Sequence, residues 1–153
     1  MDRAFINWDE DVFRLSEADL SRHPLLATKG AYAVLAAKLD ETADLWRGLR
    51  LLYIGLSRQD NLRDAVVACP VAEAIAAALR EGEEAIVMVG AMESNLGRMT
   101  TGFLDDVERC LAFRHCAACM KRPKGAHEGR KISVVNRGDF APLKPKCLLR
   151  PEG

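Results

Sequence analysis

The apolar positions of this chain fall into short blocks that predict a mixed α and β protein. Two strand-length apolar runs, 31–37 and 49–54, each carry a tyrosine beside a glycine. A third run, 85–91, is almost continuously apolar and predicts a buried strand, and a shorter strand is expected over 132–135. A moderate connection separates the first two runs, so we expect them to pair as antiparallel neighbours.

Helix-period patterns occupy much of the rest. Residues 58–69 and 71–80 each place apolar side chains on one face, which predicts two successive helices. The segment 102–118 predicts a longer helix, and Glu108 borders its apolar stripe. We therefore expect an α+β fold in a single domain, with a small antiparallel sheet packed by helices.

Two polar stretches predict less regular structure. Residues 8–23 have apolar side chains at helical intervals and predict one or two short helices. Residues 38–48 are acidic and turn-rich, and predict a loop between the first two strands.

Composition narrows the class of protein. The chain has 153 residues, of which 49% are hydrophobic and 29% charged, as is usual for one globular domain. No run approaches the roughly 18 apolar residues of a membrane span, and the acidic N-terminus shows no secretion signal. We expect a cytoplasmic protein whose five cysteines are reduced.

Charge is distributed unevenly although the net charge is zero. Residues 1–108 hold 19 acidic and 11 basic side chains, whereas residues 109–150 hold 2 acidic and 11 basic ones. The basic segment indicates a polyanionic partner such as DNA, or else a solvated basic surface.

Four side chains carry candidate chemistry. Tyr32 and Tyr53 lie on the first two predicted strands, Arg63 on the helix that follows, and Glu108 on the helix 102–118. Phenol, guanidinium and carboxylate groups together suit chemistry on a phosphate ester. Taken singly, each has a structural alternative as a half-buried tyrosine, a surface arginine or a helix-edge ion-pair partner.

These residues belong to a longer series: Gly30-Ala31-Tyr32, Tyr53-Ile54-Gly55, Ser57, Arg63 and Glu108. In this order the series resembles the GIY-YIG nuclease superfamily. The resemblance implies a three-stranded antiparallel sheet flanked by helices, and metal-dependent endonuclease cleavage of phosphodiester bonds in DNA. It divides the chain into an N-terminal helical extension, a catalytic domain and a basic segment that packs on or extends this domain, over residues 1–27, 28–120 and 121–153.

The resemblance also implies a role for each matched residue. Tyr32 would help to activate the attacking water, directly or through a hydrogen-bonded chain, and Tyr53 would position that water or a phosphate oxygen. Arg63 would bind the scissile phosphate. Glu108 would be the one protein ligand of a Mg²⁺ or Mn²⁺ ion. The expected contacts to nucleic acid are Ser57, Lys121, Arg122 and Lys124.

Two features depart from the family's pattern. The tyrosines lie 21 positions apart, so residues 38–48 are expected to be an insertion. Ala126 stands where the family often has an asparagine, and His127 follows it.

Two other functions stay open at this point. The same scaffold would serve as a binding module whose cleft holds a nucleic acid or nucleotide without cutting it. For the nuclease, a protein partner would be a possible source of targeting. Alternatively, a zinc ion would staple an interaction protein through four ligands drawn from Cys110, His115, Cys116, Cys119 and His127. Without zinc, these cysteines would be core or helix-end thiols.

Overall fold

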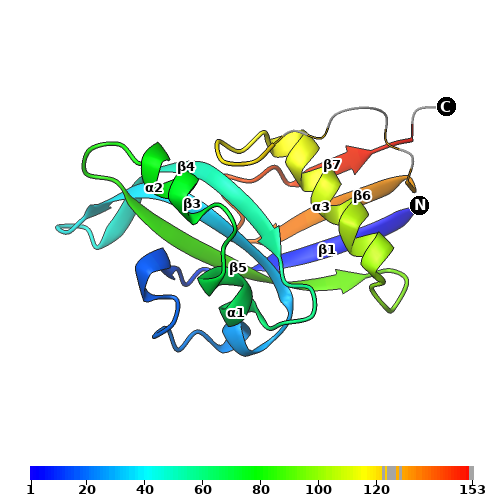
Figure 1. Ribbon diagram of the computed structural model, residues 1–153, viewed down its shortest axis with the longest axis horizontal. Helices are drawn as coiled ribbons and strands as arrows, with labels where there is room; N and C mark the ends of the chain where they lie inside the picture. Colours follow the sequence, from blue (N-terminus) through cyan, green and yellow to red (C-terminus); the bar gives the residue numbers. More distant parts are fainter. Residues whose placement is uncertain (122, 124–126, 128, 152–153) are drawn as a thin grey trace.

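A curled seven-stranded sheet forms the body of the molecule in the computed structural model, which describes residues 1–121, 123, 127 and 129–151 (Figure 1). The strands are β1 (Asp2–Trp8), β2 (Phe13–Arg14), β3 (Gly30–Asp40), β4 (Leu45–Leu56), β5 (Glu84–Ser94), β6 (Ile132–Gly138) and β7 (Lys146–Leu149). Their order is β4-β3-β5-β1-β6-β7, with β2 pairing additionally to β5. All pairs are antiparallel except β1 with β6, so the sheet is mixed.

The prediction of a small three-stranded sheet is wrong. Strands β4, β3 and β5 do pair as antiparallel neighbours, but they make up only one part of the sheet. Strand β1 was missed because its apolar residues, Ala4, Phe5, Ile6 and Trp8, follow neither a strand period nor a helix period closely in so short a segment. Strand β7, with four residues, is too short to give a periodic signal.

The segment 38–48 forms the end of a long β-hairpin and not a loop, which corrects a second prediction. Strand β3 runs to Asp40 and β4 starts at Leu45, so only four residues turn the chain. Across this end Arg47 Nε lies 2.7 Å from Asp40 Oδ2. The tip of the hairpin is polar because it projects beyond the core. Its polar residues were therefore mistaken for a loop although most of them belong to strands.

The helices are shorter than the sequence predicts. They are α1 (Leu62–Val67), α2 (Ala72–Ala78) and α3 (Thr101–His115). The predicted N-terminal helical extension is also wrong, because its residues form β1, β2 and the 3₁₀ turns η1 (Leu15–Glu17) and η2 (Pro24–Ala27). The three segments that the sequence predicts, 1–27, 28–120 and 121–153, each supply strands to the same sheet.

Two apolar layers cover opposite faces of the sheet. Alternate residues of β3 illustrate this, since Ala33 and Leu35 pack in one cluster with α3, and Tyr32 and Val34 in the other with α1 and α2. Helix α3 contacts β4 at one end of the strand order and β6 and β7 at the other. The sheet must therefore curl around α3 into a half-barrel, as Figure 1 shows.

None of the described helices is both long and apolar enough to cross a membrane.

Candidate functional site

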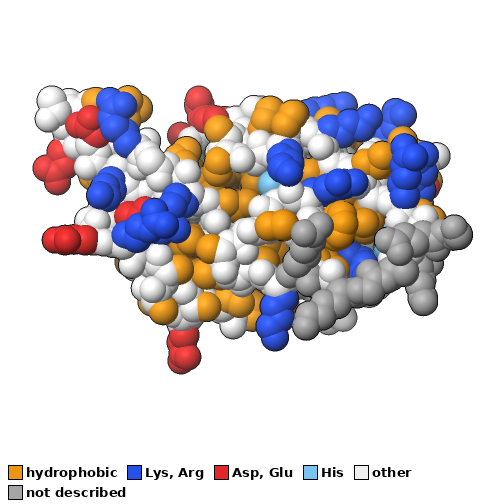
Figure 2. Space-filling view, turned by 90° about the horizontal axis from the view of Figure 1, so that it is seen from above, with side chains coloured by type: hydrophobic (Ala, Val, Ile, Leu, Met, Phe, Trp, Pro, Cys, Tyr) orange, Lys and Arg blue, Asp and Glu red, His pale blue; other side chains and the backbone are white. Residues whose placement is uncertain are grey.

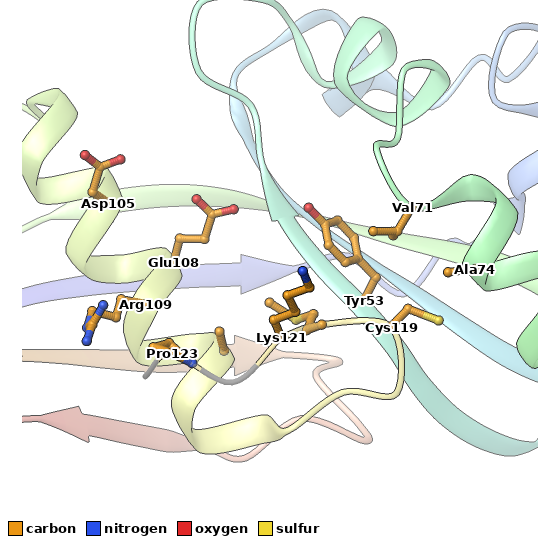
Figure 3. A pocket seen from close by; sticks show the side chains of 11 residues that line it. Tyr53, Val71, Ala74, Asp105, Glu108, Arg109, Cys119, Lys121 and Pro123 are labelled. Carbon is orange, nitrogen blue, oxygen red and sulfur yellow. The ribbon is translucent and has the colours of Figure 1, made fainter. Parts of the chain in front are cut away.

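An open cavity of about 560 Å³ lies between the edge of β4 and the outer side of α3 (Figure 3). Tyr53 contributes from β4, Val71 and Ala74 from the start of α2, and Glu108 from α3. The segment 117–120 follows α3 and forms one side of this cavity. Its backbone is hydrogen-bonded to the edge of β4. For example, the backbone N–H of Cys119 donates to the carbonyl of Leu52 at 2.7 Å.

Glu108 projects into this cavity, as the sequence predicts. Thr100 caps α3 by accepting a hydrogen bond from the N–H of Phe103 at 3.2 Å, which fixes where the helix begins. Val107 and Leu111 are fully buried on its inner face, so the intervening Glu108 is turned to the rim. Figure 3 shows its carboxylate and the Tyr53 hydroxyl pointing toward one another across the opening.

Arg58 is the partner of Glu108, and the sequence did not single it out. Its Nη2 donates to Glu108 Oε2, and its Nη1 lies 3.0 Å from Asp105 Oδ1. The Nη1 group meets Asp105 without the alignment of a hydrogen bond, so that ion pair is the looser of the two. The sequence feature that could have identified Arg58 is its position, because it directly follows Ser57 at the end of the second tyrosine motif.

The two tyrosines lie on adjacent strands, which confirms part of the geometric prediction. Tyr32 is paired with Gly55, and Val34 with Tyr53, so both phenols are on the same face of the sheet. Their ring centroids are 6.0 Å apart with an angle of 47° between the planes. They differ in exposure, because Tyr53 lines the cavity and Tyr32 is 2% exposed behind it.

Both phenols are protonated at neutral pH. Burial raises the pKa of Tyr32 far above its usual value. Burial also raises the pKa of Tyr53, the neighbouring Glu108 carboxylate raises it further, and a hydrogen bond with Tyr32 acts in the opposite direction. Tyr53 is therefore a hydrogen-bond donor at the cavity wall, whereas Tyr32 is buried.

The glycine of the second motif has a packing role. A Cβ atom at Gly55 would lie 2.5 Å from Cζ and 2.7 Å from the hydroxyl oxygen of Tyr32. The Tyr32 ring thus lies directly over Gly55, and only a residue without a side chain leaves room for it.

Arg63 does not line the cavity, so the structure does not place it where the resemblance implies that it would bind a phosphate. Its Nη1 donates to the carbonyls of Ala18 and Asp19, each at 3.0 Å, and its Nη2 to the carbonyl of Ser21 at 2.7 Å. These bonds tie α1 to the segment after η1. The guanidinium of Arg63 therefore holds this segment in place through hydrogen bonds to its backbone carbonyls.

Ser57 is also committed within the protein. It is 3% exposed, and its Oγ accepts from the N–H of Gly30 at 2.8 Å and donates to the carbonyl of the same residue. These bonds join the end of β4 to the start of β3, so Ser57 offers no group to a nucleic acid.

Lys121 lines the cavity, and Figure 3 shows its ammonium group directed into it. The other basic residues predicted to contact nucleic acid, Arg122 and Lys124, lie outside the described residues, as does Ala126.

The proposed zinc ligands do not converge. Cys110 is buried on the inner face of α3, Cys116 is exposed at the end of this helix, and Cys119 lies at the β4 edge. Among the described residues, no group of three or more histidine, cysteine or acidic side chains has the spacing of a metal site. Burial raises the pKa of the Cys110 thiol to about 12, as expected of a core cysteine.

Comparison of this chain with protein-family models, curated proteins and solved structures found no match. The resemblance to GIY-YIG nucleases therefore depends on the motif order alone, and functional interpretation depends on the geometry of the cavity.

Proposed function

We propose that this protein is a divalent-metal-dependent endonuclease that hydrolyses phosphodiester bonds in DNA. The observation that supports the proposal is the open cavity into which Tyr53 and Glu108 point, with the Arg58 guanidinium bound to the Glu108 carboxylate. A phenol donor, an acidic oxygen ligand and a cation are the groups needed to hold and polarise a phosphodiester.

A divalent ion suits the acidic residues of this cavity. Asp105 and Glu108 already share one cationic group, the guanidinium of Arg58, so their oxygens converge on a point where positive charge is stable. Mg²⁺ commonly takes one or two carboxylates and completes its shell with water and phosphate oxygens. Glu108 would be the main ligand, and when bound the ion would offset charge on the phosphate and the leaving oxygen.

The side chains of the cavity then have distinct roles. Tyr53 stays protonated and donates a hydrogen bond to a phosphate oxygen or to the attacking water. Arg58 holds the carboxylates in place until a substrate phosphate competes for its guanidinium. Lys121 adds a second positive charge at the opening. Arg58 thus supplies the phosphate-binding cation in place of Arg63.

A second candidate function, binding of DNA without cleavage, is favoured by the ion pairs themselves. Glu108 is neutralised by Arg58, and Arg63 is held by three backbone carbonyls. A cavity in this state offers hydrogen-bond donors to a phosphate without an exposed metal ligand.

Cleavage of supercoiled plasmid in Mg²⁺ or Mn²⁺ tests the proposal. We expect the wild-type protein to nick the plasmid, and Glu108→Gln to lower the rate about 100-fold or more, as for loss of a group that stabilises transition-state charge. Glu73→Gln, a change of the same type at an exposed position of α2, is the control and should retain activity.

Two results would count against this function. Equal nicking by the wild type and Glu108→Gln would assign the activity to a contaminant. DNA binding by the wild type without nicking, unchanged in Glu108→Gln, would support the second function in place of the first.

A further inference from the structure

A second cavity, of about 260 Å³, lies between α3 and β7 and is basic. It is lined by Arg109, Phe113 and Arg114 from α3, and by Leu149 and Arg150 at the end of β7, with His127 and Pro151 completing it. Among the described residues that line this cavity there is no carboxylate. Three guanidinium groups around one hollow create a positive potential that attracts phosphate.

The two cavities share one lining residue on α3. Arg109 lines both of them, one residue after Glu108 in the first cavity and five residues before Arg114 in the second. Figure 2 shows Lys and Arg side chains gathered over the end of the molecule that holds α3 and β7, with few acidic side chains among them. The outer side of α3 is therefore a basic track that starts at the candidate active site.

Arg114 is held in position on this track. Its Nε donates to the backbone carbonyl of Leu148 at 2.7 Å, and its guanidinium carbon lies 5.2 Å from the centre of the Phe113 ring. The side chain of Arg114 is nonetheless exposed, as is that of Arg150. A guanidinium anchored through Nε presents its two terminal nitrogens outward in a fixed orientation, which suits a phosphate.

We propose that a nucleic-acid strand runs from the first cavity past Arg109 into the second, where its phosphates contact Arg114 and Arg150. The choice of nucleic acid rests on the proposed function. The second cavity offers guanidinium groups and one aromatic ring, but no set of amide or carboxylate groups to read base edges. Binding on the track is therefore through the backbone and independent of sequence.

Salt-dependent binding to labelled duplexes of two unrelated sequences tests this track. Each phosphate contact contributes a fixed release of counterions, so we expect Arg114→Gln/Arg150→Gln to reduce the slope of log K against log salt by about 2. Both sequences should lose affinity by the same factor. A matched control is Arg22→Gln/Lys29→Gln, which removes two exposed charges from the segment around η2 and should leave the slope unchanged.

A small substrate separates this inference from the proposed function. Bis(p-nitrophenyl) phosphate has a single phosphodiester and no strand to extend along the track, so we expect its hydrolysis to be the same in the wild type and Arg114→Gln/Arg150→Gln. Since Arg114 also bonds to β7, Arg150→Gln alone provides a second variant, with an expected slope change of about 1.

An unchanged slope in both variants would overturn the track, even if the plasmid is cut. Absence of all hydrolysis by the wild type would overturn the proposed function, while the binding slopes would still decide the track. Loss of affinity for only one of the two sequences would overturn binding through the backbone.

Discussion

Gly55 and Tyr32 form a cross-strand pair in which the missing side chain of Gly55 leaves room for the Tyr32 ring. Because an added Cβ would lie 2.5 Å from the Tyr32 ring, we expect Gly55→Ala to lower the free energy of unfolding by about 1–3 kcal/mol, the usual cost of overpacking. Urea denaturation followed by far-UV circular dichroism measures this change.

Two comparisons establish the cause of that loss. Gly102→Ala, at an exposed position in the first turn of α3 where the nearest atom is 3.8 Å away, should not reduce stability. In a Tyr32→Ala background the cost of Gly55→Ala should largely disappear, since the clashing ring is gone. An undiminished cost in that background would show that Tyr32 is not the reason for a glycine at this position.

The order of the motif residues identified the two cavity residues Tyr53 and Glu108, but it selected Arg63 where the structure has Arg58 beside Glu108. Arg63 matches the motif, yet its partners are three carbonyls of a loop that is distant in sequence. Arg58 matches no predicted role, yet it binds Glu108. A guanidinium has the same chemistry in both places, so only the folded position of its neighbours decides which arginine pairs with Glu108.

At the level of elements, Arg50 and Glu83 connect the hairpin strand β4 to the turn before β5. Arg50 Nη2 lies 2.6 Å from Glu83 Oε1 and also donates to the carbonyl of Ala78 at 3.0 Å. The hydrogen bonds from Arg50 lower the pKa of Glu83 to about 2 from an ordinary value of 4.5. The ion pair therefore joins α2, β4 and β5 around one carboxylate.

This pKa shift predicts a pH-dependent contribution to stability. A carboxyl whose pKa is lower in the folded state stabilises it fully above the unfolded value of 4.5, and loses that effect as the pH falls toward about 2. We expect Glu83→Gln to lower the melting temperature at pH 7, with the difference from the wild type shrinking between pH 4.5 and 2. Thermal unfolding at several pH values measures this.

The control for the Glu83 prediction is Glu81→Gln, which removes an exposed carboxylate two residues away. It should leave the melting temperature nearly unchanged at every pH, because exposed charges contribute little. A loss in Glu83→Gln that persists undiminished at pH 2 would contradict the role assigned to its charge.

The elements that the sequence predicted best are those with a strong periodic signal. The expected strands 31–37, 49–54 and 85–91 lie within β3, β4 and β5, and the expected helix 102–118 covers most of α3. The missed strands β1 and β7 are short, or only half apolar, and gain their stability from neighbours elsewhere in the chain. Local patterns carry no information about such pairing.

At the scale of the whole molecule, β1 is an interior strand between β5 and β6. Ile6 on its inner face is fully buried, whereas Arg3 is exposed. We expect Ile6→Ala to lower the free energy of unfolding by about 2–5 kcal/mol, through lost apolar burial and a residual cavity. Arg3→Ala on the same strand should change it by no more than about 0.5 kcal/mol.

Urea denaturation of both β1 variants distinguishes the observed sheet from the N-terminal extension that the sequence predicts. An extension outside the core would give two equally small effects. The observed sheet predicts a large loss of stability only for Ile6→Ala, because β1 lies between β5 and β6 and its inner face is part of the core.

The sequence by itself determined the mixed α and β character, the antiparallel β3–β4 pair, and the meeting of Tyr53 with Glu108 near one cavity. These depend on local periodicity and on a motif of fixed order. The tertiary structure alone decided the size and curvature of the sheet, the pairing of Glu108 with Arg58, and the basic cavity beside α3. Each depends on contacts between residues far apart in sequence, and those contacts form only when the sheet curls around α3.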